Sequence, residues 1–138
     1  IGGVVIPNEY GSVGHSDGDV LIHAIVDSLL GAANFGDIGK LFPSSEKKWK
    51  DCNSLNFLDI SNGKLMSKGY EIIHIDSTII LQTPIISEFI PGMKNKISKI
   101  LDIELSQISI KATTTDYLGY IGESKGLAAQ SISTIQNK

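Results

Sequence analysis

Arginine is absent from this sequence, and all 12 basic residues are lysines. Arginine is the side chain that holds phosphate or carboxylate groups through two parallel hydrogen bonds. A site for an anionic ligand in this chain must therefore use backbone N–H groups, hydroxyl groups, lysine or a metal ion. Because 15 residues are acidic, the formal net charge is −3. This charge gives no overall attraction to nucleic acid or to an anionic membrane, and we predict neither as a partner.

Cysteine and long apolar runs are also scarce. Cys52 is the only cysteine, which excludes an intrachain disulfide and a zinc site made of several thiolates. We interpret Cys52 as an incidental thiol. No apolar run is long enough to span a membrane. The chain starts at Ile1-Gly2-Gly3 without a methionine or a targeting signature, and we expect it to be a fragment of a longer protein.

The length of 138 residues and the spacing of apolar residues indicate one domain, residues 1–138, with its own core. Strand patterns and helical patterns alternate along the chain without repeats or linkers. This order predicts an α/β (α+β) fold: a mixed four-stranded sheet with helices on one face. We expect strands at residues 4–7, 70–81, 106–112 and 127–136, and helices from Asp17 or Asp19 to about 34, from 53 or 54 to 68, and from Pro91 onward.

Two segments depart from the pattern of buried elements. Residues 44–51 are polar and rich in lysine, and we expect a mobile loop there. The last strand carries Gln130, Ser131, Ser133 and Thr134 among its apolar residues, unlike a strand that is buried on both faces. One face of this strand is therefore expected to meet water or a partner subunit.

The first of three polar clusters is His15-Ser16-Asp17-Gly18-Asp19 together with the apolar segment that follows it. If Asp19 opens a helix, then Asp19, His23 and Asp27 lie on one helix face. His23 between two carboxylates is a candidate metal ligand, although a histidine on a helix is more often an ordinary core or surface residue. His15 and Ser16 precede the helix, where free backbone N–H groups attract phosphate.

The other two clusters lie in loops. Residues 35–43 contain two glycines, which let the backbone approach a ligand, and Asp37, which can accept hydrogen bonds from sugar hydroxyls. An ordinary helix-exit loop is the alternative. Thr113-Thr114-Thr115-Asp116 follow the strand expected at 106–112. Hydroxyl and N–H groups suit phosphate oxygens and a carboxylate suits Mg²⁺, but a threonine-rich strand end is the alternative.

Taken in order, the three clusters resemble the 2-C-methyl-D-erythritol 2,4-cyclodiphosphate synthase family of the non-mevalonate isoprenoid pathway. The resemblance covers essentially the whole chain without large insertions. The matching segments are Ile1-Gly2-Gly3-Val4 with Ile6-Pro7, His15 to Asp19 with His23-Ala24, Leu29 to Ala33, Gly36 to Pro43, and Lys111 to Thr115 with Leu118-Gly119.

The resemblance implies an enzyme and its reaction. The 2-phosphate of 4-diphosphocytidyl-2-C-methyl-D-erythritol 2-phosphate attacks the β-phosphorus, expels CMP and closes a cyclic diphosphate. Two cofactors are implied: a Zn²⁺-type ion that orients the phosphates, and a Mg²⁺ or Mn²⁺ ion on the cytidine diphosphate. The family is a homotrimer with sheets inside, helices outside and active sites between neighbouring subunits. This assembly would explain the polar residues of the last strand.

The resemblance also implies residue roles. His23 is a ligand of the zinc-type ion and Asp116 of the Mg²⁺ or Mn²⁺ ion, while His15 and Thr114 are catalytic and steady the transition state. Phe42 to Glu46 form a flexible flap, and Ser54 lies near it. The implied substrate-binding residues on the erythritol and phosphate side are His15, Ser16, Asp37, Ile38, Gly39, Phe42, Pro43, Ser44, Ser45 and Glu46. On the cytidine side they are Leu81, Gln82, Thr83, Pro84, Ile85, Ile86, Ser87, Thr113, Thr114, Thr115 and Asp116, and Tyr120 is included with them.

The sequence also departs from the family. Family members carry an N-terminal strand with an Asp-x-His pair that supplies two further transition-metal ligands, and this pair does not occur here. We therefore expect a weak or empty transition-metal site in this chain. Glu123 stands where many members have an arginine near the central channel, so an anion there would meet negative charge. Ser44 replaces an acidic residue and Ile85 a lysine. Asp116 stands for a glutamate and has a shorter reach to the cation.

Two alternatives to the synthase remain open at this point. One is a non-catalytic module that binds cytidine nucleotides, and the other is a metal-dependent phosphohydrolase with water as nucleophile. The abundance of isoleucine, lysine and asparagine suggests an AT-biased genome. We expect a plastid-type organelle as the compartment, with a bacterial cytoplasm as the alternative.

Overall fold

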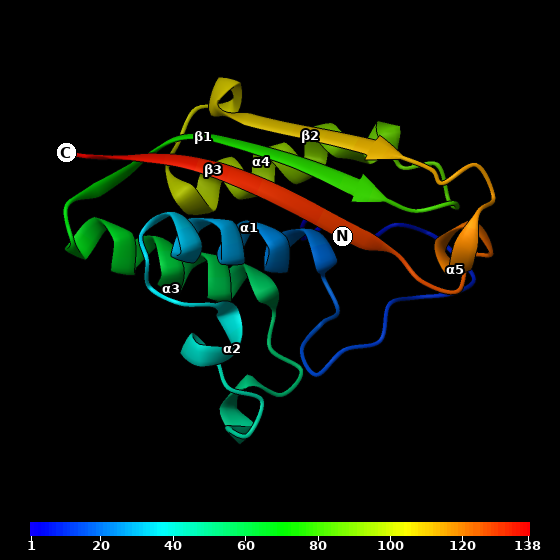
Figure 1. Cartoon of the computed structure of the whole chain (residues 1–138), viewed down its shortest axis with the longest axis horizontal. Helices are drawn as coiled ribbons and strands as arrows, with labels where there is room; N and C mark the ends of the chain where they lie inside the picture. The colour runs from blue at the N-terminus through cyan, green and yellow to red at the C-terminus, as the bar shows by residue number, and fades with distance from the viewer.

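A three-stranded sheet lies beside three long helices in the computed structural model, which describes all 138 residues (Figure 1). The central strand is β1 (Tyr70–Ile80). It pairs in parallel with β2 (Ile108–Thr113) and antiparallel with β3 (Ala128–Asn137), which gives the order β2-β1-β3. The long helices are α1 (Val20–Ala32), α3 (Ser54–Ser67) and α4 (Ile90–Leu101), and the short ones are α2 (Ile38–Leu41) and α5 (Gly119–Gly122).

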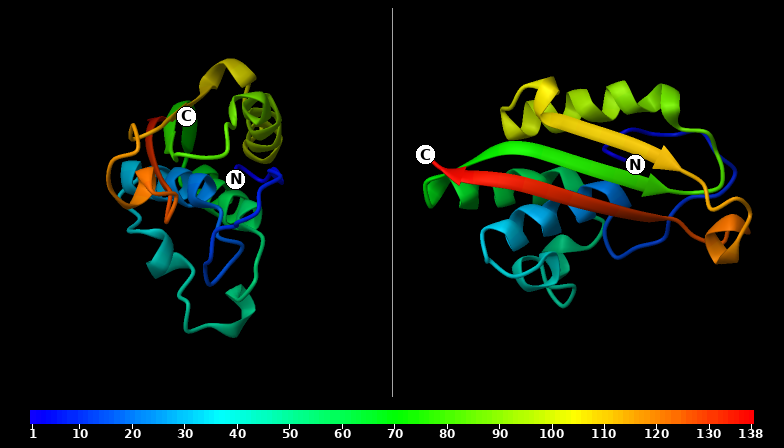
Figure 2. Two further views of the ribbon diagram at one scale, coloured as in Figure 1. Left: turned by 90° about the vertical axis from the view of Figure 1, so that its right-hand side faces the viewer. Right: turned by 45° about the horizontal axis from the view of Figure 1, so that its top comes forward.

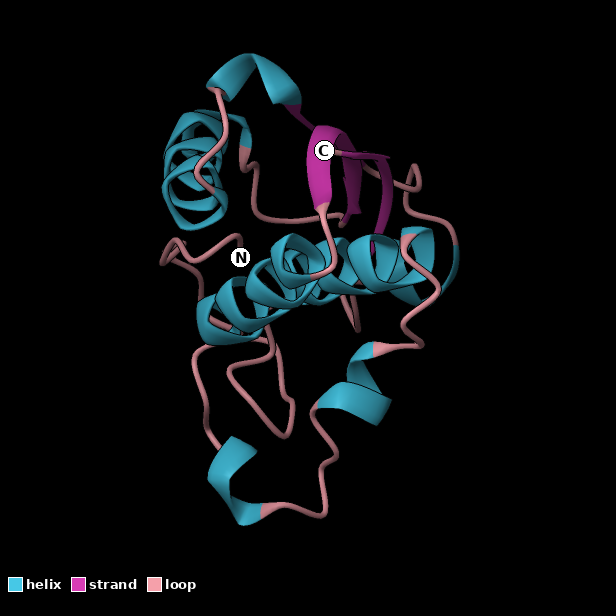
Figure 3. Cartoon of the chain, turned by 90° about the vertical axis from the view of Figure 1, so that its left-hand side faces the viewer, coloured by secondary structure: helices cyan, strands magenta, loops and turns pink.

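The helices cover one face of the sheet, as expected (Figures 2 and 3). Helix α1 packs on β3 and β1, α4 packs on β2, and α3 packs on β1 and against both other helices. The core between these layers is apolar. It includes Leu21, Ile25, Leu29, Leu58, Leu65, Ile75, Ile79, Met93 and Ile97, each 0% exposed. None of the helices combines the length and the apolarity needed to cross a membrane.

The mixed single-domain fold is confirmed, but the expected fourth strand is wrong. Residues 4–7 form no strand, and the sheet has three strands. Gly2 and Gly3 both adopt positive φ angles of 61° and 71°, and Val4 N donates to Ile1 O at 3.1 Å, so the chain turns here. The sequence also missed three short elements: α2, α5 and the 3₁₀ turn Lys47–Trp49 lie in segments that were expected to be loops.

The polar residues of the last strand follow the two faces of the sheet. Ser131 and Ser133 of β3 face α1, where the hydroxyl of Ser28 lies 3.2 and 2.6 Å from their hydroxyls. Ile132 between them, 74% exposed, and the exposed Gln130 and Thr134 on either side lie on the face that no helix covers. The sheet therefore presents one open face. The polar residues of β3 contact the hydroxyl of Ser28 on the face toward α1, and they are exposed on the open face.

The first turn of α1 is tied to the N-terminal segment by Asp19. Its carboxylate caps the helix by accepting from Ile22 N at 3.1 Å. It also accepts from Gly2 N at 2.9 Å and from Gly3 N at 2.7 Å. Asp19 is only 6% exposed and has no cationic partner, so these N–H groups and the helix N-terminus carry the stabilisation of its charge.

We expect Asp19→Ala to lower the free energy of unfolding by about 2–4 kcal/mol, because it removes a helix cap and leaves two backbone N–H groups without a partner. Urea denaturation followed by the fluorescence of Trp49, the only tryptophan, measures the loss. Asp19→Asn keeps one acceptor oxygen and is expected to lose less. Equal stability of Asp19→Ala and the wild type would contradict this role.

Candidate functional site

A cleft of about 320 Å³ lies beside the N-terminal half of α1. Most of its lining comes from three separate segments. His15 and Ser16 come from the loop before α1, and His23 comes from the helix itself. Ile38, Gly39, Phe42, Pro43, Ser44 and Ser45 come from α2 and the turn after it. Eight residues that the sequence assigned to the phosphate side of the site, and the predicted metal ligand His23, are therefore brought together by the fold.

An aromatic cluster closes this cleft on one side. Phe42 stacks on Phe57 with ring centroids 4.5 Å apart, and Trp49 meets both rings edge-on, at 5.1 and 5.7 Å. Trp49 and Phe57 line the cleft, and sequence reasoning assigned neither to the site. The sequence did carry a signal for Trp49, because a single large aromatic residue in a polar, lysine-rich segment indicates a packing contact there. Its packing connects residues 44–51 to the core through α3.

A hydrogen-bond network joins the cleft to α3. His23 Nε2 lies 2.9 Å from Ser54 Oγ and 3.1 Å from Ser16 Oγ. Ser54 donates to Asp17 twice, from Oγ at 2.5 Å and from its backbone N at 2.8 Å. Burial acts to raise the pKa of Asp17, but the hydrogen bonds from Ser54 and from Asp19 N outweigh it and hold this pKa below its ordinary value.

Two aspartates shape the turn that carries Ile38 and Gly39. Asp37 caps α2, because its Oδ1 accepts from Lys40 N at 2.7 Å. Asp27, on the face of α1 that also holds Asp19 and His23, accepts from Ile38 N through Oδ1 at 2.7 Å. Asp37 therefore lies beside the cleft as a cap and does not line it. Asp27 attaches the turn to α1.

The residues assigned to the cytidine side gather where β1 and β2 end, beyond the right-hand end of the sheet in Figure 1. Leu81 N donates to Thr113 O at 3.0 Å, and Tyr117 N donates to Gln82 Oε1 at 3.0 Å. The two predicted segments therefore touch. Ile85 and Tyr120 are exposed at 82% and 60%, whereas Ile86 is buried in the core at 1%. A contact from Ile86 to a ligand would have to come from its backbone.

Hydroxyl groups and one carboxylate follow β2. Thr114 Oγ1 accepts from Asp116 N at 3.3 Å, and Thr115 Oγ1 donates to Leu118 O at 2.8 Å. Asp116 is exposed and pairs with no cation. Its carboxylate is thus free to bind a hard cation together with phosphate oxygens.

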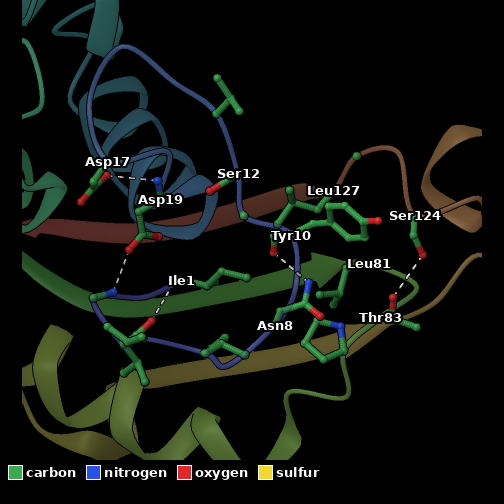
Figure 4. Close-up of a pocket in the computed structure, with 18 of the residues that line it drawn as sticks. Ile1, Asn8, Tyr10, Ser12, Asp17, Asp19, Leu81, Thr83, Ser124 and Leu127 are labelled. Carbon is green, nitrogen blue, oxygen red and sulfur yellow. Dashed lines mark hydrogen bonds between the residues drawn. The ribbon is translucent and has the colours of Figure 1, made fainter.

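A larger hollow of about 880 Å³ lies between the N-terminal segment and the cytidine-side residues (Figure 4). Asp17 and Asp19 lie at one end of it, and Thr83 and Ser124, whose hydroxyls are 3.1 Å apart, lie at the other. Leu81, Thr83 and Pro84 line this hollow, but no residue lines both it and the smaller cleft. Within one chain the two predicted parts of the site are therefore separate.

The chain does not contain a complete metal site of its own. No group of three His, Cys, Asp or Glu residues is placed to hold a metal ion. His23 fits a zinc-type site as one ligand only, whereas such sites use three or four protein ligands. Glu46 and Glu123 pair with the neighbouring Lys48 and Lys125 at 2.6 and 2.5 Å and do not point to a further metal site.

Comparison with known proteins identifies the relatives of this chain. Residues 1–136 match the model of the YgbB family. The curated 2-C-methyl-D-erythritol 2,4-cyclodiphosphate synthase of Clostridium kluyveri is 51% identical over 99% of this chain and 84% of its own length. The synthase of Clostridium acetobutylicum is 52% identical over 96% of this chain and 85% of its own length. These relatives are bacterial, so the expected plastid-type compartment finds no support in them.

Solved structures agree with this fold. The bifunctional IspDF of Campylobacter jejuni is 39% identical with a TM-score of 0.95, over 99% of this chain and 37% of its own. The complex of Plasmodium falciparum IspF with CDP is also 39% identical, with a TM-score of 0.81 over 91% of this chain and 76% of its own. The similarity therefore includes a protein that binds a cytidine nucleotide.

We expect Asp27→Ala to loosen the turn at Ile38 and Gly39, because the charged hydrogen bond to Ile38 N is worth about 1.5 kcal/mol. Hydrogen exchange of the Ile38 amide should then be roughly 10-fold faster, since 1.4 kcal/mol corresponds to a factor of ten. Asp27→Asn keeps an acceptor and serves as the matched control. Unchanged exchange at Ile38 in Asp27→Ala would show that the turn is held by other contacts.

Proposed function

The chain belongs to the YgbB family of 2-C-methyl-D-erythritol 2,4-cyclodiphosphate synthases, which are cyclising phosphorus–oxygen lyases, and on this premise we propose its reaction. It converts 4-diphosphocytidyl-2-C-methyl-D-erythritol 2-phosphate to 2-C-methyl-D-erythritol 2,4-cyclodiphosphate and CMP. The observation that carries the proposal is the cleft in which nine predicted residues from three segments meet. His15 and Ser16 lie there beside the turn at Ile38 and Gly39.

The proposed reaction needs positioning and charge neutralisation more than proton transfer. An oxygen of the 2-phosphate forms the new bond to the β-phosphorus, while the bond from that phosphorus to the bridging oxygen breaks and the oxygen leaves with CMP. The nucleophile is already an oxyanion, so no base has to activate it. The chain contributes by holding both phosphates in line and by stabilising the equatorial oxygens.

The residues of the cleft have complementary roles in this proposal. His15 and Ser16 hold the phosphate beside the start of α1, and the backbone around Ile38 and Gly39, which Asp27 attaches to the helix, holds the erythritol part. Asp37 lies beside the cleft, and its Oδ2, which is not used in capping α2, accepts hydrogen bonds from the erythritol hydroxyls. On the cytidine side, Thr114 steadies the diphosphate, and residues 81–87 with 113–116 hold the nucleotide. Since arginine is absent, hydroxyl and N–H groups supply these contacts.

Two residues of the chain, Asp116 and His23, would hold divalent cations, which would supply further charge neutralisation. Asp116 fits a Mg²⁺ or Mn²⁺ ion, because such ions are commonly held by one or two carboxylates together with substrate phosphates. When bound, this ion would neutralise charge on the diphosphate. His23 would be one nitrogen ligand for a zinc-type ion, but a complete zinc site would need ligands that this chain does not place beside it. The roles given to His15, Ser16 and Thr114 do not depend on that ion.

A homotrimer would unite the two separate parts of the site. The substrate carries erythritol at one end and cytidine at the other, whereas the cleft and the cytidine-side residues share no lining within one chain. The sheet face that no helix covers exposes Ile132 at 74% and Ile73 at 37%. We place this face at the centre of the trimer, where it brings the cleft of one copy toward the cytidine side of the next.

We expect the chain to release CMP and the cyclic diphosphate when substrate, Mg²⁺ and Zn²⁺ are supplied, as measured by ³¹P NMR. His15→Ala and Thr114→Ala should each reduce kcat by roughly 10²–10³-fold, because each removes a contact to developing charge. Ser67→Ala, at the exposed end of α3, is the control and should keep full activity. Release of inorganic phosphate would indicate a phosphohydrolase. Quenching of Trp49 fluorescence by CDP without turnover would indicate a binding module.

We expect a mass near three times 14.8 kDa in sedimentation equilibrium. Ile132→Lys places a charge on the open sheet face and should shift the chain toward monomer, because burying an unpaired ammonium group is costly. Met66→Lys introduces the same charge at an exposed apolar residue of α3 and should remain trimeric. A monomeric wild type, or a trimeric Ile132→Lys, would contradict the proposed interface.

A further inference from the structure

We propose that Asp17 and Ser54 hold the imidazole of His23 in one tautomer, with the hydrogen on Nε2 and the lone pair of Nδ1 free. Both residues are thus positioning residues for His23, and neither contacts the substrate. The tautomer follows from the hydrogen bonds of the chain itself. Its importance for catalysis rests on the proposed function.

The direction of the hydrogen bond from Ser54 to Asp17 is fixed by chemistry. An ionised carboxylate only accepts hydrogen bonds, so the 2.5 Å contact between Ser54 Oγ and Asp17 Oδ1 uses the hydroxyl hydrogen of Ser54. Ser54 N at 2.8 Å and Asp19 N at 3.1 Å also donate to this carboxylate and hold it in place. Ser54 is 0% exposed, so water does not compete for its hydroxyl.

This direction determines the proton on His23. A serine hydroxyl has one hydrogen, and that of Ser54 is already donated to Asp17. The oxygen of Ser54 can therefore only accept from His23 Nε2, 2.9 Å away, which requires a hydrogen on Nε2. Ser16 Oγ lies 3.1 Å from the same nitrogen. Because Nε2 carries the hydrogen, the Ser16 oxygen also accepts from it and shares the same bond.

The other ring nitrogen is left available. Within the chain, both hydrogen bonds of the His23 side chain involve Nε2, and Nδ1 has no partner. The ring also packs against Phe57, with centroids 5.9 Å apart, which limits its rotation. A neutral imidazole binds a metal ion or accepts a hydrogen bond through the nitrogen without hydrogen. In this site that nitrogen is Nδ1. The Ser54–Asp17 pair fixes the orientation of the ring through its hydrogen bond to the other nitrogen, Nε2.

Nitrogen NMR of the chain tests the tautomer directly. The metal-free, ¹⁵N-labelled protein is measured over a pH series, and the tautomer is taken from the alkaline plateau, where the ring shifts no longer change and the rings are neutral. Only three histidines contribute signals. In the wild type we expect the pattern of an Nε2–H ring for His23, with the two nitrogens widely separated in chemical shift. In Ser54→Ala both tautomers should be populated and this separation should shrink.

Two further variants separate positioning from simple stability. Ser54→Thr keeps the hydroxyl and should restore the wild-type pattern. Ser61→Ala removes a hydroxyl that is equally buried on the same helix but has no hydrogen-bond partner, and it should leave His23 unchanged.

An Nδ1–H ring in the wild type, or a wild-type pattern in Ser54→Ala, would overturn the proposal. The wild-type spectrum decides the tautomer even if Ser54→Ala does not fold. Turnover is a separate measurement: a chain that fixes the tautomer but releases no CMP would contradict the proposed reaction alone.

Discussion

The carboxylate of Asp19 is the contact on which the arrangement of the site depends. A buried negative charge without a cationic partner is stable only where several donors converge on it, and here these are Ile22 N, Gly2 N and Gly3 N. The same contact starts α1 and holds the N-terminal segment on it. The loop that carries His15 and Ser16 lies between these two fixed points, so its geometry follows from the cap.

Helix α1 then distributes the other parts of the site along one face. Asp19, His23 and Asp27 follow one another at intervals of four residues, and each has a different task. Asp19 begins the helix, His23 faces the cleft, and Asp27 holds the turn of α2 through Ile38 N. Helix α3 supports this face through Ser54, the first residue of that helix. A site made mostly of loop residues thus gains its order from two helices packed on a sheet.

The pattern of the sequence predicted the fold well where periodicity was strong. Helix α4, with Met93, Ile97 and Leu101 buried, begins within one residue of its expected start at Pro91, and the central strand β1 matches its expected range of 70–81 within one residue. It failed at residues 4–7, where a short apolar run ended by a proline predicted a strand. There the backbone N–H groups of Gly2 and Gly3 bind the distant carboxylate of Asp19, and a contact 16 or 17 residues away leaves no local signal.

By itself the sequence determined the family, the residue types of the phosphate site and the absence of arginine, because these depend only on which residues occur and in which order. Only the tertiary structure decided which of them meet. It brought His15, His23, Ile38, Gly39 and residues 42–45 into one cleft, left the cytidine-side residues apart from it, and placed Ser54, bonded to Asp17, against His23. The physical reason is that hydrogen bonds and packing act over a few ångströms in space, whatever the distance along the chain.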